Sequence, residues 1–265
     1  MSGIDVDSAL QLLRHGELSV EGRLVDASNA SLLCEIGLDG AQARCIYKPV
    51  AGERPLWDFP DGTLAGREVA TYLLSEATGW RIVPPTVLRD GPFGPGMCQL
   101  WVDTDPSVRL IDVVPPSRLP AGWLRVLDAL GSGGQPVVLG HADDVRLRRM
   151  AVLDAVVNNA DRKGGHVLPL PDGQVLGVDH GVCFHVESKL RTVLWGWAGE
   201  ALSADETTVL HRLGEHLDGD LGSQLAGLLT RAEVRATRRR IDGLLSDGRF
   251  AVPMEGWPSI PWPPF

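Results

Sequence analysis

The hydrophobic pattern of this chain changes along its length, and the change limits the folds that it can adopt. Between residues 18 and 50 the apolar runs LSVEGRLV, ASLLCEI and RCIYKPV are short and separated by turn sequences, as in a meander of strands. A helical spacing of apolar residues follows at 64–77, and two further short strands are expected at 86–90 and 97–103. The first part of the chain is therefore predicted to be a β-rich lobe with one helix.

The second part of the chain is predicted to be mostly helical. Residues 103–120 are polar and rich in proline, so we expect an N-lobe over 1–103 and a C-lobe over 104–265. A β-hairpin is expected over 166–179, and the tail VPMEGWPSIPWPPF has too many prolines for a helix and should fold back over the body. Helices are expected at 121–131, 142–159, 204–218 and 221–246.

Composition narrows the class of protein. The 265 residues are 44% hydrophobic and carry a net charge of −9, which argues against nucleic acid or an anionic membrane surface as the main partner. No apolar run approaches the roughly 18 residues of a membrane helix, and MSGIDVDSAL lacks the regions of a signal peptide. The four cysteines form no C-x-x-C pair that would indicate a disulfide framework or a zinc site. The expectation is a cytoplasmic protein without a membrane anchor.

Lysine is rare in this chain, with three lysines against 22 arginines, and Lys48 stands at a position where burial is costly. It ends the third expected strand, while Glu68 lies on the apolar side of the helix 64–77. We expect an ion pair between these two side chains, with the ammonium free to touch phosphates. The alternative is that Lys48 reaches solvent and Glu68 pairs with Arg67 or Arg81.

The segment AVVNNADRKGGHVL concentrates polar side chains between a helix and a strand. Asp161 at its centre could accept a proton from a hydroxyl nucleophile, while Arg162 and Lys163 stabilise a phosphoryl group in transfer. The alternative is a polar turn that uses asparagine and aspartate for capping.

A second carboxylate follows in VLGVDHGVCF. Asp179 ends an apolar strand beside a glycine turn, a suitable position for a side chain that holds a divalent cation between phosphate oxygens. The alternative is an ordinary β-turn of the x-Asp-x-Gly type.

The order of these elements resembles that of a known superfamily. The chain looks like a compact member of the phosphatidylinositol-kinase-like branch of the protein-kinase superfamily, and it is similar to a family of actinobacterial hypothetical proteins with distant similarity to phosphatidylinositol 3- and 4-kinases. The segments NNADRKGGHVL and VDHGVCF carry the resemblance. It implies an α+β, two-lobed protein-kinase-like fold, with a β-rich N-lobe and a mostly helical C-lobe.

The resemblance also implies roles for individual residues. Lys48 would contact the phosphates of ATP and Glu68 would hold it, Asp161 would be the catalytic base, and Asp179 would bind a metal. The loop between the first two strands would cover the phosphates with Ser28 and Asn29. The hinge that meets adenine would consist of Gln99, Leu100, Trp101 and Val102.

This chain departs from the superfamily pattern Asp-Arg-His-x-x-Asn, which here reads Asp161-Arg162-Lys163-Gly164-Gly165-His166. Lys163 would supply the charge of the usual histidine, and His166 would replace an asparagine that binds metal. Imidazole suits Mn²⁺ better than Mg²⁺, so ATP with Mg²⁺ or Mn²⁺ is expected, with a preference for manganese or with one metal site instead of two. The alternative is that His166 bonds only to the backbone.

The expected acceptor is a protein hydroxyl, including one of its own, or a small soluble alcohol. The segment after Asp179 offers only Lys189 and Arg191 against Glu187 and Glu200, which is too little positive charge for a lipid headgroup at a membrane. Two other functions stay open: a nucleotide-binding pseudokinase or scaffold, and an enzyme that transfers AMP on the same fold.

Overall fold

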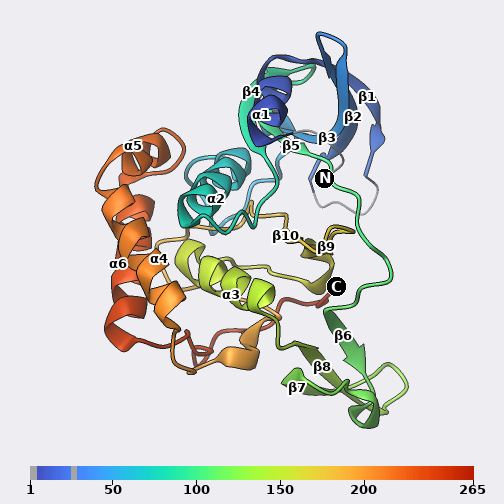
Figure 1. Cartoon of the computed structure of the whole chain (residues 1–265), viewed down its shortest axis with the longest axis vertical. Coiled ribbons are helices and arrows are strands. Elements are labelled where there is room, and N and C mark those ends of the chain that lie inside the picture. Colours follow the sequence, from blue (N-terminus) through green and yellow to red (C-terminus); the bar gives the residue numbers. More distant parts are fainter. Residues whose placement is uncertain (1–4, 25–28) are drawn as a thin grey trace.

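The computed structural model describes residues 5–24 and 29–265, which form two lobes (Figure 1). The N-lobe contains an antiparallel five-stranded sheet in the order β1-β2-β3-β5-β4. Its strands are β1 (Glu17–Arg23), β2 (Leu32–Leu38), β3 (Ala41–Pro49), β4 (Thr86–Gly91) and β5 (Gly94–Leu100). The expected meander, followed by two more strands, is therefore confirmed.

Helix α1 (Val6–His15) closes one face of this sheet. The Asp5 carboxylate accepts a hydrogen bond from the backbone N–H of Ser8 and so caps the helix. Leucines 12 and 13 are buried against the sheet, where they meet the thiols of β2, β3 and β5. Those cysteines serve as small apolar residues, which explains why they show no pairing pattern in the sequence.

Helix α2 (Leu64–Thr78) lies between the lobes (Figure 1). Thr63 caps its beginning, and Gly79, in the left-handed region, ends it. Every residue from Ala65 to Tyr72 is buried, because α2 packs against the N-lobe sheet on one side and the C-lobe on the other. Any charged side chain on this helix therefore needs a partner.

The C-lobe is built on helices α3 (Val145–Val157), α4 (Ala204–Leu217), α5 (Asp220–Ala226) and α6 (Arg231–Asp247). Capping boxes start α4 at Ser203 and α6 at Thr230. The expected single helix over 221–246 is interrupted at 227–230, where Thr230 opens α6. A short antiparallel hairpin of β9 (Val167–Pro169) and β10 (Val175–Gly177) lies under the N-lobe, as predicted.

The expected helix at 121–131 is wrong. This segment is β7 (Trp123–Leu130), the edge of a sheet in the order β6-β8-β7 with β6 (Ile111–Val114) and β8 (Pro136–Ala142). The leucines and valine of WLRVLDAL fit a helix as well as a strand. The apolar run PVVL, which begins after five intervening residues, supplies the partner strand and so favours the strand. The sheet projects from the C-lobe (Figure 1).

The C-terminal tail folds back over the body, as predicted. Ser259 accepts hydrogen bonds at its carbonyl from the Thr192 backbone N–H and the Trp195 indole, at 3.0 and 2.8 Å. The Gly164 N–H donates to the Pro264 carbonyl at 2.8 Å. The tail therefore contacts the segment that carries Asp161. Among the residues described, no helix is both long and apolar enough to cross a membrane.

Candidate active site

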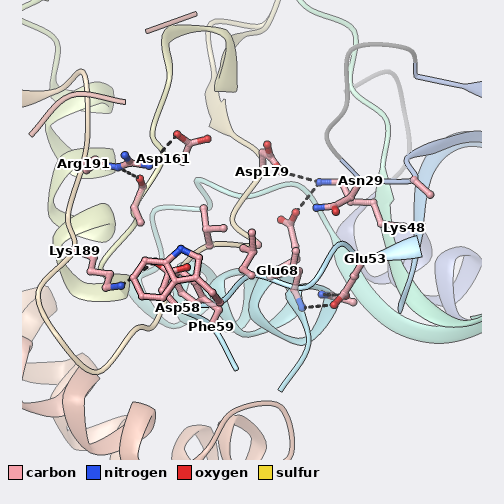
Figure 2. Close-up of a pocket in the computed structure, with 18 of the residues that line it drawn as sticks. Asn29, Lys48, Glu53, Asp58, Phe59, Glu68, Asp161, Asp179, Lys189 and Arg191 are labelled. Carbon is pink, nitrogen blue, oxygen red and sulfur yellow. Dashed lines mark hydrogen bonds and ion pairs between the residues drawn. The ribbon is translucent and has the colours of Figure 1, made fainter. Parts of the chain in front are cut away.

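Three side chains meet where the lobes face each other. The Lys48 ammonium lies 2.7 Å from Glu68 Oε1 and 2.9 Å from Asp179 Oδ1 (Figure 2). Lys48 comes from β3, Glu68 from α2 and Asp179 from the segment after β10, so the contact joins both lobes. The expected pair of Lys48 with Glu68 is present, and the alternative partner Arg67 instead binds Glu233.

The ion pairs fix the charges of this group. Burial alone would lower the pKa of Lys48, but the Glu68 and Asp179 carboxylates outweigh it and raise the pKa above its ordinary value. The Lys48 ammonium in turn lowers the pKa of Asp179, against the effect of burial. The lysine is therefore a cation and Asp179 a carboxylate across the physiological pH range.

The backbone at Asp179 has an unusual conformation. Its φ is 62°, in the left-handed region that aspartate tolerates better than most residues. The next N–H, that of His180, donates to Glu68 Oε2 at 2.9 Å. Glu68 thus holds both the lysine and the turn after Asp179, so α2 determines where both groups lie.

Arg162 is fully buried beside the site, and its hydrogen bonds hold neighbouring segments in place. Its guanidinium donates two bonds of 2.9 Å to the Asp154 carboxylate, one of 3.0 Å to the Val178 carbonyl, and approaches His180 Nε2 at 2.6 Å. Burial and the Arg162 charge lower the pKa of His180 well below its ordinary value, so its ring is neutral and accepts from Arg162. One arginine therefore links the turns that carry Asp161 and Asp179.

Asp161 lies between two cations. Its backbone N–H donates to the Asn159 side chain at 3.0 Å, which fixes the turn. The carboxylate lies 3.4 Å from the Lys163 ammonium and 3.7 Å from the Arg191 guanidinium. Lys163 lines the cavity under the N-lobe sheet, and Arg191 lines a different cavity. The two cations therefore flank the carboxylate from opposite sides.

His166 lies beside Asp179. Its Nε2 is 3.4 Å from Asp179 Oδ2, and its buried Nδ1 has no hydrogen-bond partner in the described part of the chain. Burial lowers the pKa of His166, which leaves the ring neutral. A neutral imidazole beside a carboxylate is a suitable pair of ligands for one cation.

The first cavity, of about 650 Å³, opens between the lobes. Its upper wall includes Leu24 and Ile46 from the N-lobe, and its lower wall includes Leu168 and Val178. Lys48, Asp161, Lys163, His166 and Asp179 line its inner end. The cavity combines two apolar faces with a charged end, a form that suits a flat ring joined to phosphates.

The segment expected to be a hinge lines this cavity. Gln99 is buried and donates from its side chain to Thr86 Oγ1 at 2.8 Å, so it supports the wall. The N–H groups of Leu100 and Trp101 already donate to the carbonyls of Pro85 and Arg44. Within 5–24 and 29–265, the N–H and carbonyl of Val102 and the carbonyl of Trp101 have no hydrogen-bond partner. These backbone groups are therefore available to a ligand, and Val102 offers both a donor and an acceptor.

A second cavity, of about 450 Å³, is also lined by Lys48, and Figure 2 shows its lining side chains. It shares Asn29, Lys48, Asp161 and Asp179 with the first cavity. Its other walls come from residues 53–65, the segment 181–191 and Trp257 of the tail. The two cavities therefore meet at the charged groups, as required for a donor and an acceptor of one transferred group.

The loop expected to cover the phosphates is described in part. Asn29 lines both cavities, and its side-chain oxygen accepts from the Arg54 N–H at 2.8 Å. Ser28 lies outside the described residues. The expectation that Arg162 stabilises a transferred phosphoryl group is wrong, because its guanidinium is fully buried, binds Asp154 and lines neither cavity. Sequence reasoning gave Arg191 no role in the site, and it had no signal for Trp257, which comes from the far end of the chain.

Comparison with known proteins defines the class of fold. No protein-family model matches the chain. The crystal structure of the Golgi casein kinase with Mn/ADP bound covers 91% of this chain and 75% of its own, with a TM-score of 0.58 and 15% identity. The structure of hydra Fam20 with sugar covers 91% of this chain and 87% of its own, with a TM-score of 0.54 and 12% identity. The chain has a protein-kinase-like fold; its place in the phosphatidylinositol-kinase branch stays a prediction.

The family is given by a closer relative. Protein Rv2133c of Mycobacterium tuberculosis is 53% identical over 268 residues, which span 98% of this chain and 96% of the relative. The chain belongs to the same family as this mycobacterial protein.

Proposed function

We propose that this chain is an ATP-dependent phosphotransferase that acts on a hydroxyl group. The observation that carries the proposal is the position of Lys48, which bonds to Glu68 and Asp179 at the junction of the two cavities. A lysine held by a helix carboxylate, next to a metal-binding aspartate, is the arrangement that kinases use for the phosphates of ATP. The division into lobes at residue 103 is part of the same proposal.

The roles follow from the two cavities. In the first, adenine would lie between Ile46 and Leu168 and bond to the backbone of Val102, with the phosphates toward Lys48 and Asn29. Asp161 would accept the proton of the acceptor hydroxyl, and Lys163 would stabilise the charge on the transferred group. The manganese and ADP of the Golgi casein kinase structure support a nucleotide with a divalent metal.

The residues present fit one divalent cation better than two. Magnesium usually binds through one or two carboxylates together with phosphates, and Asp179 with His166 offers such a partial set. The described part of the chain contains no group of three or more histidine, cysteine, aspartate or glutamate side chains that would form a cage on their own. The cation would offset phosphate charge, while Asp179 and His166 would hold it.

Calorimetry and intact-mass spectrometry test this function together. ADP should bind in the presence of Mn²⁺ or Mg²⁺, and Asp179→Ala should abolish the metal-dependent part of that binding. Asp161→Asn should bind ADP with nearly unchanged affinity. Absence of nucleotide binding in the unmodified protein would refute the proposal and favour a scaffold.

The mass of the protein after incubation with ATP distinguishes the remaining alternatives. A phosphate adduct that is lost in Asp161→Asn would identify the acceptor as the protein itself. An AMP adduct would replace phosphate transfer by AMP transfer on the same fold. Binding without an adduct is the result expected for a kinase whose acceptor is another molecule.

A further inference from the structure

Among the residues that the structure describes, one cation of the second cavity has no hydrogen-bonded carboxylate. Lys48 bonds to Glu68 and Asp179, and Lys189 bonds to Asp58 at 2.8 Å. Arg191 differs: its Nε donates to the Ala160 carbonyl at 2.6 Å, and its nearest carboxylate is that of Asp161 at 3.7 Å, beyond hydrogen-bond distance. One edge of the guanidinium is thus left for a ligand.

The other candidate for an anion site in this cavity is already occupied. The first turn of α2 points its N–H groups toward the cavity, but the Glu53 carboxylate accepts from Leu64 and Ala65 at 2.9 and 2.8 Å. The helix terminus therefore has its anion, which leaves Arg191, among the described residues that line this cavity, as the group that would recognise one.

The outer wall is made of aromatic rings gathered around Lys189. Its ammonium lies 5.4 Å from the ring centres of Trp57 and Trp257 and 5.8 Å from that of Phe59. The lysine side chain is only 7% exposed, and its bond to Asp58 adds to the cation–π contacts. These contacts join the loop after β3 to the tail and so form a wall on this side of the cavity. An extended peptide would need a groove that is open at this point, so the wall favours a small ligand.

The indole of Trp257 adds a polar feature to that wall. Its Nε1 is buried and has no hydrogen-bond partner among the described residues. The Arg191 guanidinium lies 6.0 Å from the centre of the same ring. A donor without a partner and a free guanidinium edge therefore lie close together in a cavity of about 450 Å³.

We infer that the second cavity binds the acceptor, and that the acceptor is a small alcohol carrying a carboxylate or phosphate group that Arg191 holds. The inference rests on the proposed phosphotransferase function. The acceptor oxygen would bond to the γ-phosphorus as the bond from that phosphorus to the β–γ bridging oxygen breaks. The hydroxyl proton would pass to Asp161, and ADP would leave with the bonding electrons.

The test uses the full chain and a fractionated mycobacterial cell extract, because the relative Rv2133c comes from Mycobacterium tuberculosis. The extract is divided into macromolecules, lipids, small molecules retained by an anion exchanger, and small molecules that are not retained. Each fraction is incubated with the protein and ATP that carries a labelled γ-phosphate. The label should enter a compound of the retained small-molecule fraction.

Other outcomes overturn the inference. Label that enters only macromolecules, lipids or unretained small molecules would show a different class of acceptor, as would the absence of any labelled product. Calorimetry with ADP and metal separates this failure from that of the proposed function: if ADP binds, the nucleotide site stands and only the acceptor class is wrong.

Variants at position 191 test the role of the guanidinium on the purified acceptor. Arg191→Gln should raise KM by about 10- to 100-fold, the effect of losing a hydrogen bond to a charged group, and Arg191→Lys should restore part of it. Both should bind ADP as the unmodified protein does. Arg235→Gln, at an exposed arginine of α6, is the matched control. An unchanged KM in Arg191→Gln would refute the assignment.

Discussion

The two cavities that meet at Lys48 are built in different ways. Strands and a hairpin enclose the first cavity, where we propose that the nucleotide binds, and backbone hydrogen bonds hold those walls in place. The second cavity, where we propose that the acceptor binds, is enclosed by residues 53–65, the segment 181–191 and the tail, which side-chain contacts around Lys189 hold together. The first cavity is therefore determined by the fold, and the second by a few side chains that a related sequence can exchange without altering the fold.

The largest expected effect is at a residue that both cavities share. Asp161→Asn removes the proposed base and should lower the rate of phosphate transfer by about 10²- to 10⁴-fold, because a positioned base contributes an effect of that size. ADP affinity, measured by calorimetry, should stay nearly the same. Asp247→Asn, at an exposed position near the end of α6, is the control. Transfer at the normal rate in Asp161→Asn would remove this residue from the chemistry.

The next effect concerns the helix that positions both cavities. Arg67 on α2 donates to Glu233 Oε1 of α6 at 2.5 Å, and both side chains are buried. Glu233→Gln leaves the guanidinium without a counter-charge, which should lower the free energy of unfolding by about 3–5 kcal/mol in urea denaturation. Glu215→Gln, on the exposed face of α4, should change it little. If the free energy of unfolding fell by less than about 1 kcal/mol, the usual contribution of an exposed ion pair, this pair would not anchor α2.

A smaller effect should separate the two cavities. Lys189→Met removes the charge that the aromatic rings surround, a contribution of about 1–2 kcal/mol. Amide hydrogen exchange should become about 5- to 30-fold faster in residues 53–60 and 251–258, since local opening becomes that much easier. Exchange in β3 and β5, and the affinity for ADP, should not change. Equal acceleration in both lobes would contradict the separation between the cavities.

The smallest effect is expected for a substitution in the wall of the first cavity. Gln99→Leu removes the side-chain bond to Thr86, whose own hydroxyl still donates to the Pro84 carbonyl. The free energy of unfolding should fall by about 1 kcal/mol, the value of a single buried hydrogen bond. Thermal unfolding with and without ADP would measure it. A collapse of nucleotide binding instead would show that this wall depends on a side chain after all.

The same difference between the cavities separates what the sequence predicts from what it does not. Lys48, Glu68, Asp161 and Asp179 are charged residues that interrupt or end apolar elements, so their spacing marks them as positions that need partners. Their distances to one another follow from the order of strands and helices. The group formed by these four side chains could therefore be anticipated from the sequence. The hinge over residues 99–102 stays a prediction, and no pattern in the sequence distinguishes Val102 from its neighbours.

The residues that line the second cavity show no comparable pattern in the sequence. Arg191 stands in a polar loop where an arginine is unremarkable, and Trp257 lies 66 positions further along, in a segment of prolines and tryptophans (257 − 191). Their proximity depends on how the tail folds back, which local periodicity does not encode. The prediction of a helix in place of β7 was wrong for a related reason. Its eight residues have a mixed apolar pattern that fits a helix or a strand until a partner strand is known.

The contact between the tail and the segment that carries Asp161 bears on how the protein should be produced. Gly164 has no Cβ, and the ring of Phe265 occupies the space where one would lie, while the Gly164 N–H bonds to the Pro264 carbonyl. An affinity tag or fluorescent protein fused after Phe265 would therefore begin beside Gly164, which is only three residues along the chain from Asp161. Activity assays should therefore use material whose tag is at the other end, or has been cleaved off.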